Sequence, residues 1–378
     1  MSERRVAADR QQRRRPRVGP RWPTPARRLD AGPAPPPTDP SSAPARLPER
    51  FAKEHGPLRS VVERVLREFI RCGMPEHGFG RAYCDACRAT YVVPFSCRGR
   101  SSCPSCEKRH ALLWAEWLGR DLLAAVSHRH LVSTIPRLLR PLFRRRRELL
   151  IELAHAAAAA IGTLMQASLG GSVQPGLVAR LASAGDLLQW HPHLHVLATS
   201  GAFSADGVFH PLDEWDAQRL MILFHGHFLA RLLEQHAVAE LLVTKLKTWR
   251  HPGFSAFVGQ PIAPENKAAL EDIAAYLLRP PLSLEKLVYL DGKQEVLYRS
   301  RMNPGLGRNF EAVDPLEWLA RMADHIPDPG KHRTLFYGAY ANRTRGARES
   351  TKPGPHPPPP TQAVHAELGA ADLEGLRR

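Results

Sequence analysis

The chain has 378 residues, enough for more than one hydrophobic core. Its net charge is +16, and the first fifty residues contribute twelve arginines against five acids, so +9 remains for the rest. A chain that stays basic without its N-terminal segment favours a polyanionic partner. A genome that favours Arg, Ala and Pro would give the same excess, so charge alone does not establish that partner.

The distribution of cysteine and apolar residues excludes two classes of protein. All six cysteines lie between positions 72 and 106, whereas a disulfide-stapled secreted protein is short and spreads its cysteines through the fold. The first 48 residues lack the apolar core of a secretory signal. The most apolar stretch, residues 149–165, contains Glu152 and His155, so we expect no membrane helix. We therefore expect a cytoplasmic protein.

Helical and strand-like patterns follow one another without a strict βαβ order, which predicts an α+β fold. Residues 1–50 hold eleven prolines and few large apolar residues, so we expect disorder there and again in the polar tail from 349. Between them the chain predicts helices over 58–69, 108–126, 141–167, 217–235, 266–278 and 314–325, and strands over 130–135, 178–182, 191–198, 208–210, 254–258, 286–290 and 295–298.

Two Cys-x-x-Cys pairs form the strongest metal signal. Cys84 and Cys87 make the first pair, and Cys103 and Cys106 make the second after fifteen intervening residues. Two thiolates three positions apart can turn onto one ion, and a second pair closes the tetrahedron. A redox pair is the alternative. The spacing favours a structural Zn²⁺ site, because four thiolates leave no open coordination position.

Other residues surround these pairs. Cys97 is a candidate buried thiol or alternative ligand, and the role of Cys72 stays open. Basic side chains nearby are candidates for holding phosphate or for a solvated face: Arg98, Arg100, Lys108 and Arg109.

The sequence from Gln189 to His195 carries three histidines at alternate positions. In a strand, Gln189, His191, His193 and His195 share one face, and Trp190, Leu194 and Val196 pack on the other. Imidazoles at this spacing can lean onto one divalent ion. A His-rich polar face is the alternative. Pro192 cannot donate to a ladder, which indicates a strand end or edge at that point. His225 and His227 fall in a helical pattern, where they do not share a face.

The ordered motifs resemble the zinc-domain HUH transposases, the IS-ninety-one type of rolling-circle insertion sequence. The resemblance covers residues 58–348, about three quarters of the chain. Its motifs are the Cys-x-x-Cys pair, Pro94-Phe-Ser-Cys-x-x-Arg-x-x-Cys-Pro-Ser-Cys106, His191-Pro-His-Leu-His195, Trp249-Arg-His-Pro-Gly-Phe254, Tyr276-Leu-Leu-Arg-Pro-Pro-Leu-Ser283, Asn309-Phe310, His325-Ile-Pro327, Tyr337-Gly-Ala-Tyr340 and Arg345-Gly346.

The resemblance implies cleavage and joining of single-stranded DNA. It implies that His193 and His195 hold Mg²⁺ or Mn²⁺, with His191 or Gln189 as a possible further ligand. Tyr276 matches the nucleophile, which forms a 5′-phosphotyrosine link without ATP. Arg279, in the same motif, is a candidate DNA contact. The implied parts are a disordered basic tail (1–50), a zinc-binding domain (51–125), an HUH nuclease of antiparallel sheet and flanking helices (126–348), and a disordered tail (349–378).

One position departs from the double-tyrosine members of that family. They have a second tyrosine four residues earlier on the helix, where this chain has Asp272. The chain therefore resembles the single-tyrosine branch. Two alternatives remain: a decayed relative that only binds DNA, and a metallohydrolase that uses the three histidines on a small substrate. Neither alternative employs all the motifs.

Overall fold

A computed structural model describes residues 55, 57–84, 87–97, 102–249, 253–303 and 307–349, all within one compact unit, Ala43–Arg378. It confirms the α+β class, because antiparallel sheets and helices occur together along the chain. The predicted disordered tail 1–50 lies outside the described residues, as does the tail predicted over 349–378 except for Glu349, which is the last residue of a helix.

A five-stranded antiparallel sheet forms the centre of the fold, in the order β13-β5-β6-β3-β9. Four of its strands fall on predicted segments, and β13 was not predicted. The C-terminal strand β13 therefore closes one edge of the sheet beside β5. The strands are β3 (His128–Thr134), β5 (Gly176–Ala184), β6 (Trp190–Thr199), β9 (Ser255–Ile262) and β13 (Thr334–Gly338).

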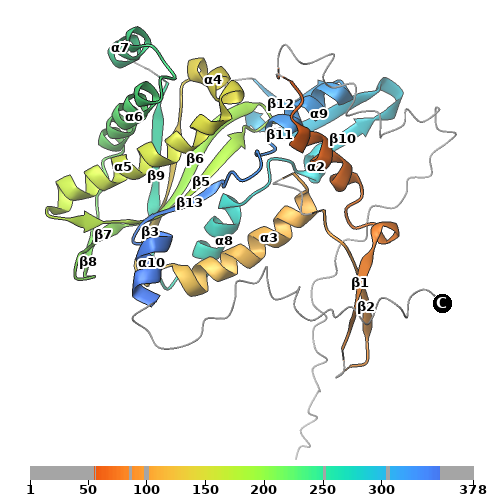
Figure 1. Ribbon diagram of the computed structural model, residues 1–378, viewed down its shortest axis with the longest axis horizontal. Helices are drawn as coiled ribbons and strands as arrows, with labels where there is room; N and C mark the ends of the chain where they lie inside the picture. The colour runs from red at the N-terminus through yellow and green to blue at the C-terminus, as the bar shows by residue number, and fades with distance from the viewer. Residues whose placement is uncertain are drawn as a thin grey trace, which may run out of the picture. The chain divides into compact units, whose positions relative to one another are not determined.

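One face of this sheet is covered by α5 (Leu150–Leu169) and α6 (Ala217–Glu234) (Figure 1). The apolar side of β6, with Leu194 and Val196, packs into this main core. The helical stretch Arg147–Leu169 is long and apolar enough to cross a membrane, but 56% of its most apolar part is buried inside the molecule. It is the core helix of the fold.

The helix predicted over 141–167 is interrupted. α4 (Arg140–Arg145) ends at Arg146, whose φ of −109° and ψ of 74° are not helical, and α5 starts at Leu150. The break lets two neighbouring arginines reach the C-terminal part of the chain. Arg144 pairs with Asp324 at 3.2 Å, and Arg147 donates to the carbonyl of Ile326 at 3.1 Å.

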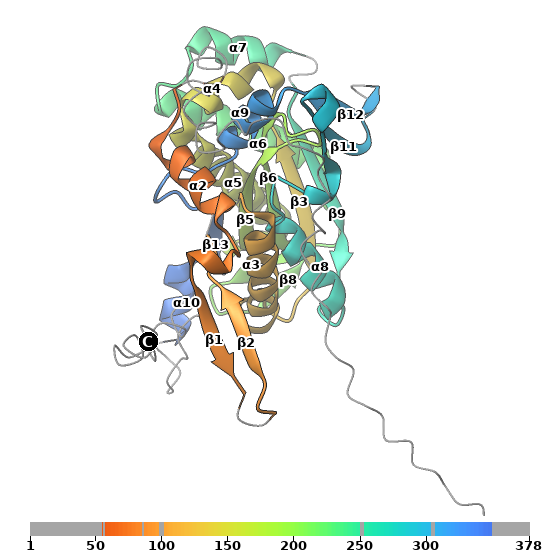
Figure 2. The same ribbon diagram turned by 90° about the vertical axis from the view of Figure 1, so that its right-hand side faces the viewer.

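The other face of the sheet is covered by α3 (Pro104–Trp117) and α8 (Lys267–Leu277), as Figure 2 shows. Their apolar residues meet Val178 of β5 and Leu197 of β6 in a second, smaller core. The helix predicted over 108–126 ends earlier, because a π-helical turn, Leu118–Leu122, follows α3. Residues of β6 that point away from the main core therefore face α8.

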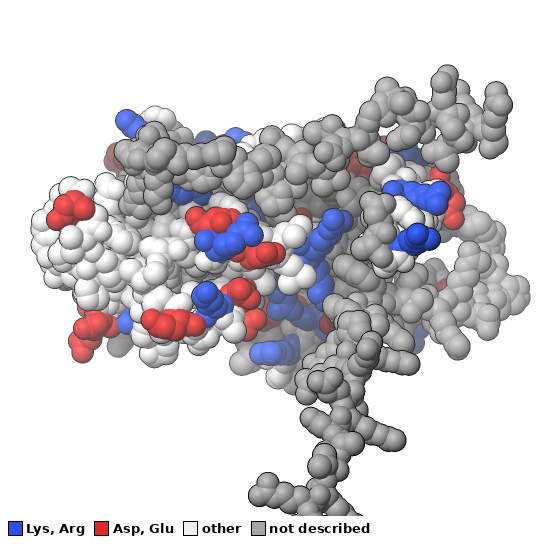
Figure 3. All heavy atoms as spheres, turned by 90° about the horizontal axis from the view of Figure 1, so that it is seen from below, with Lys and Arg blue, Asp and Glu red and all other residues white. Residues whose placement is uncertain are grey.

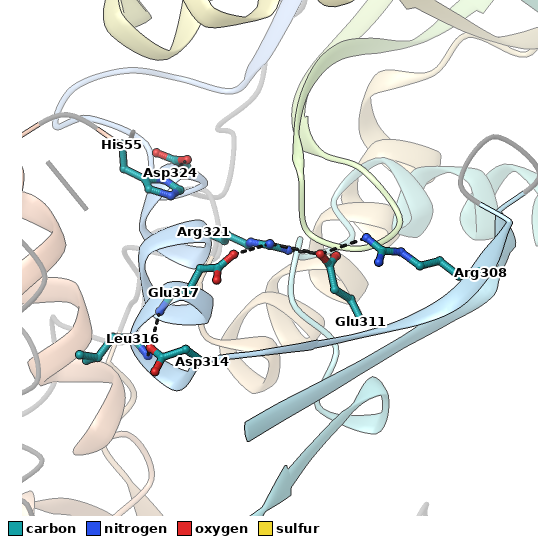
Figure 4. A network of polar contacts seen from close by, with 8 residues as sticks. All are labelled: His55, Arg308, Glu311, Asp314, Leu316, Glu317, Arg321 and Asp324. Atoms are coloured by element: carbon teal, nitrogen blue, oxygen red, sulfur yellow. Dashed lines mark hydrogen bonds and ion pairs between the residues drawn. The ribbon is translucent and has the colours of Figure 1, made fainter. Parts of the chain in front are cut away.

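A third core joins the first described helix to residues beyond 280. α2 (Ser60–Ile70) packs with α9 (Pro315–Asp324) and with the sheet β10 (Leu287–Leu290), β11 (Glu295–Asn303) and β12 (Arg308–Val313). Figure 4 shows Asp314 capping α9, and Glu311 of β12 pairing with Arg308 and Arg321 at 3.2 and 3.0 Å. The first described helix therefore shares a core with residues beyond 280.

The remaining elements are shorter. The hairpin of β1 (Phe79–Tyr83) and β2 (Thr90–Pro94) projects away from the central sheet (Figures 1 and 2), and no residue of its strands is fully buried. The others are β4 (Val173–Gln174), β7 (Gly201–Ser204), β8 (Phe209–Pro211), α7 (Glu240–Thr248), α10 (Asn342–Glu349), and 3-10 turns at Pro75–His77, Arg137–Leu139, Arg147–Leu149, Leu284–Lys286 and Asp291–Lys293.

Candidate functional site

The histidines lie on β6, the central strand of the five, which pairs with β3 on one side and with β5 on the other. Pairing with β3 ends at Thr134↔His193, and the register with β5 shifts between Ala182 and Ala184. Pro192 sits where both ladders are interrupted, so its missing N–H costs no hydrogen bond. The alternation predicted from the sequence is confirmed, since Trp190, Leu194 and Val196 lie in the main core.

His193 and His195 point at one another across the face that α8 covers. Their Nε2 atoms are 3.1 Å apart. Two ligands on adjacent octahedral positions of an ion with bonds near 2.1 Å lie about 3.0 Å apart. The two nitrogens therefore already have the separation that one divalent ion requires.

The other ring nitrogen of each histidine has its own partner. His193 Nδ1 donates to the backbone carbonyl of His191 at 2.7 Å, which leaves the Nε2 lone pair available. His195 Nδ1 lies 3.0 Å from Nε2 of His130, a residue of β3, and the two rings stack. When His195 donates to His130, its Nε2 is also free to accept a metal. Such outer partners orient metal-binding imidazoles.

The site keeps these imidazoles neutral. Burial lowers the pKa of His195 to about 3, with further lowering by the charges of His193, His130 and Arg180. Burial also lowers the pKa of His130 to about 4 and lowers the pKa of His193. A metal takes the neutral imidazole, so the ligand form is the one that this site stabilises at neutral pH.

Tyr276 stands over the histidine pair. Ala274 and Leu277 anchor α8 in the sheet's second core, and Tyr276 lies between them in sequence on the same helix. The Tyr276 ring meets the His195 and His130 rings at centroid distances of 5.4 and 5.8 Å, and 45% of the tyrosine is exposed. Its hydroxyl can therefore meet a substrate at the same place as the histidines.

The candidates for a further ligand are Gln189 and His191. The Gln189 side chain accepts a hydrogen bond from the Leu187 amide at 2.9 Å. The centroid of the His191 ring lies 5.1 Å from that of the His193 ring. Among the residues that the structure describes, the histidines form no group of three closely spaced ligand atoms. A role for His191 as a third ligand stays a prediction.

A cavity of about 770 Å³ opens onto the histidine pair and Tyr276. Nine Lys and Arg side chains line it against three carboxylates, so its charge suits a polyanion. Arg180 and Arg333 are deeply buried in its wall, and burial lowers the pKa of each, to about 10 and about 9. The face seen in Figure 3, by contrast, intersperses acidic with basic side chains.

Four cysteines gather at the start of α3. The Sγ atoms of Cys72, Cys97, Cys103 and Cys106 lie within 4.8 Å of one another, and three of the pairs are 3.5 to 3.7 Å apart. Ligands at the corners of a tetrahedron with Zn–S bonds of 2.3 Å lie about 3.8 Å apart. Hydrogen bonding by Cys103 lowers the pKa of the Cys106 thiol to about 5. The group therefore fits a structural zinc ion.

This group differs from the predicted one in two members. Cys103 and Cys106 belong to it, but Cys84 and Cys87 stand at the far end of the β1–β2 hairpin. Antiparallel pairing brings the chain before β1 next to the chain after β2, and Gly73 N donates to Phe95 O at 3.2 Å. Cys72 and Cys97 meet there, about 17 Å from the hairpin tip at 3.4 Å per residue.

Comparison with known proteins identifies the family. Residues 45–135 match the model of the transposase zinc-binding domain, and residues 176–348 match a model described as "Putative transposase". The chain is 26% identical over 326 residues to the transposase for insertion sequence element IS801 of Pseudomonas savastanoi pv. phaseolicola, covering 80% of this chain and 78% of that protein. It is 25% identical over 328 residues to "Putative transposase y4qJ" of Sinorhizobium fredii, covering 79% of each. No solved structure matches.

The chain belongs to the IS-ninety-one-type transposases. It is therefore a DNA-processing enzyme that binds DNA, and it carries a zinc-binding domain.

The predicted DNA contacts of this transposase are spread over different surfaces. Arg279 lines the cavity just after the C-cap of α8, and its amide donates to the carbonyl of Tyr276 at 3.1 Å. Lys108 and Arg109 are exposed on α3. Arg98 and Arg100 lie outside the described residues. Sequence analysis missed His130, because a lone histidine opening a strand carries no signal until its partner strand is known.

Proposed function

We propose that this transposase cleaves single-stranded DNA at insertion-sequence ends and rejoins the strands in rolling-circle transposition. The observation that carries the proposal is the 3.1 Å approach of the two Nε2 atoms beneath the ring of Tyr276. In this proposal β6 supplies the metal ligands and α8 supplies the nucleophile of phosphoryl transfer.

Each residue has a distinct task in this proposal. His193 and His195 bind Mg²⁺ or Mn²⁺ through Nε2, and a bound ion supplies Lewis-acid stabilisation of the charge on the scissile phosphate. His130 holds the His195 ring in place. The Tyr276 oxygen attacks phosphorus, so that an O–P bond forms as the P–O3′ bond breaks. The 3′ oxygen leaves as a hydroxyl, and its proton replaces the one lost by tyrosine.

The covalent step explains how strands are joined without ATP. The 5′-phosphotyrosine retains the energy of the phosphodiester bond, and a second 3′-hydroxyl reverses the attack. Asp272, one turn before Tyr276 on α8, is exposed and offers no second tyrosine. A single-tyrosine reaction follows.

The cavity is the proposed path of the strand. Most of the charged side chains that line it with the histidines are basic. This suits a flexible single strand whose phosphates pass close to the histidine pair. Affinity that rests on such contacts falls steeply as salt rises. We propose that the protein acts on DNA in the bacterial cytoplasm, associated with the nucleoid while it works.

The zinc-binding part is proposed to have a structural role. We assign its ligands as Cys72, Cys97, Cys103 and Cys106, whose Sγ spacing suits a closed tetrahedron. Its proposed extent is 51–125, followed by the nuclease over 126–348. α2 packs against residues beyond 280, so the zinc-binding part also supports the nuclease.

The test is a covalent adduct. The protein is incubated with Mn²⁺ and single-stranded oligonucleotides that span the element's ends, then run on a denaturing gel. Wild type and the control Tyr289→Phe, an exposed tyrosine on β10, are expected to form the adduct, and Tyr276→Phe is not. No adduct from wild type, with salt-sensitive DNA binding retained, would indicate a decayed transposase that only binds DNA.

A further inference from the structure

Two polar atoms in the cavity wall lack partners within the described protein. They are Nε2 of His191 and Nε of Arg140, and both are buried without a hydrogen bond. Buried polar atoms are almost always hydrogen-bonded, so an unpartnered donor in a cavity indicates where a ligand binds. His191 and Arg140 both line the cavity that contains the histidine pair.

Positive charge gathers at the same place. Arg137 precedes Arg140 by one turn, and the two guanidinium groups repel each other. His191 lines the same cavity, and its neighbour Trp190 is hydrogen-bonded to the backbone of Arg140. Two of the three carboxylates that line the cavity pair with other arginines: Asp324 with Arg144, and Glu311 with Arg308 and Arg321. An anion would relieve this repulsion and supply the missing acceptors.

The backbone holds this cluster in a fixed position. β3 ends at Thr134, and the chain then turns through Arg137 into α4. Trp190 Nε1 donates to the carbonyl of Arg140 at 2.9 Å, which ties the start of α4 to the residue just before His191. The His191 ring lies 5.1 Å from His193 on the same face of β6. The cluster therefore lies immediately beside the histidine pair.

We propose that Arg137, Arg140 and His191 form a phosphate-binding subsite for the nucleotide next to the scissile one. The subsite rests on the proposed function, because it positions the same strand that Tyr276 attacks. The two guanidinium groups bind the phosphate oxygens, and His191 donates from Nε2. His191 is then a phosphate contact and not the further metal ligand that its position in the sequence suggested.

The experiment measures binding and cleavage separately. Affinity for a single-stranded end oligonucleotide is measured in chelator by fluorescence anisotropy, for wild type, Arg140→Gln, His191→Ala and the control Arg219→Gln. Arg219 is exposed on α6 and does not line the cavity. A second set of oligonucleotides carries a neutral methylphosphonate at single positions beside the cleavage point. Arg140→Gln keeps the backbone bond to Trp190, and circular dichroism checks its fold.

We expect Arg140→Gln to weaken binding about tenfold, as loss of a charged hydrogen bond implies. The slope of log affinity against log salt should become shallower by about 0.7. A methylphosphonate at one adjacent position should weaken wild type by a similar factor but leave Arg140→Gln unchanged. The control should match wild type throughout.

Three outcomes overturn the subsite. In the first, Arg140→Gln binds DNA like wild type. In the second, the loss of affinity from Arg140→Gln adds fully to the loss from every methylphosphonate. In the third, His191→Ala binds DNA normally in chelator but needs more Mn²⁺ to form the adduct. The last result makes His191 a metal ligand. Failure of the proposed function is distinguishable, because wild type then forms no adduct with Mn²⁺ while the binding measurements remain readable.

Discussion

The two candidate metal centres of this transposase are built in different ways. His193 and His195 stand two residues apart on a strand that has neighbours on both sides and a large core behind it. The four gathered cysteines come from the end of α2, the end of the β1–β2 hairpin and the start of α3. The sheet fixes the histidines before any ion arrives, whereas the β1–β2 hairpin has no buried strand residue that would hold it against α2 and α3.

The surroundings of each centre support this contrast. His195 is buried, and His193 and His130 lie in the same layer under α8. The hairpin strands beside the cysteines expose large apolar side chains, among them Tyr83, Tyr91 and Val92 at 55 to 57%. We therefore propose that a metal ion at the first centre contributes to chemistry and that one at the second contributes to folding.

The largest expected effect is on the histidine pair. His193→Ala or His195→Ala removes half of the ligand pair, and we expect adduct formation to fall by about a thousandfold or more because the phosphate loses its Lewis acid. The melting temperature should change little, since the sheet holds the strand. The exposed His210→Ala on β8 is the control. A variant that unfolds instead would show that the histidines support the fold.

The cysteine centre should behave in the opposite way. Cys97→Ser is expected to lose bound zinc and to lower the melting temperature, because the ion joins the hairpin, which has no buried core of its own, to α2 and α3. Cys84→Ser, at the hairpin tip, should keep both. Zinc content by elemental analysis and thermal unfolding measure the two. Equal zinc loss in Cys84→Ser would favour the ligand set that the Cys-x-x-Cys spacing predicts.

A smaller effect is expected at His130. His130→Ala removes the hydrogen bond to His195 Nδ1, and outer partners of metal ligands typically contribute about 10- to 100-fold in metal affinity. Half-maximal adduct formation should therefore require more Mn²⁺ and recover at high Mn²⁺. A loss that no Mn²⁺ concentration restores would place His130 in direct contact with the reacting groups.

The smallest effect concerns pH and stability. Burial lowers the pKa of His128 and of His325 from 6.5 to about 4. Below pH 6.5 these two histidines take up protons in the unfolded chain but stay neutral in the folded chain. Their contribution should therefore lower stability as pH falls from 6.5 to 4, and should not change above pH 6.5. Melting temperatures across this range measure it. His325→Gln should reduce the slope, and an unchanged slope would contradict the assignment.

Much of the sheet could be predicted from the sequence, because alternation and helical spacing are local signals. The alternating faces around His193 and the strand interruption at Pro192 follow from side-chain period and from proline's missing donor. The interruption at Arg146 was missed, because nothing in the local spacing shows that Arg144 must reach Asp324.

The partners of the site residues could not be predicted in the same way. Which strand lies beside β6 is a long-range property, so His130 had no visible role. Tyr276 was assigned by resemblance, and only the packing of α8 brings its ring to His195. The cysteine spacing gave no hint that hairpin pairing brings Cys72 to Cys97.

The most direct test of the central claim is to map the covalent link. The Mn²⁺ reaction with the end oligonucleotide is digested with nuclease and protease, and the peptide that carries the nucleotide remnant is sequenced by mass spectrometry. We predict a single modified residue, Tyr276, through a 5′-phosphate. A remnant on another residue, such as Tyr337 or Tyr340, would contradict the assignment of the nucleophile and of the site around it.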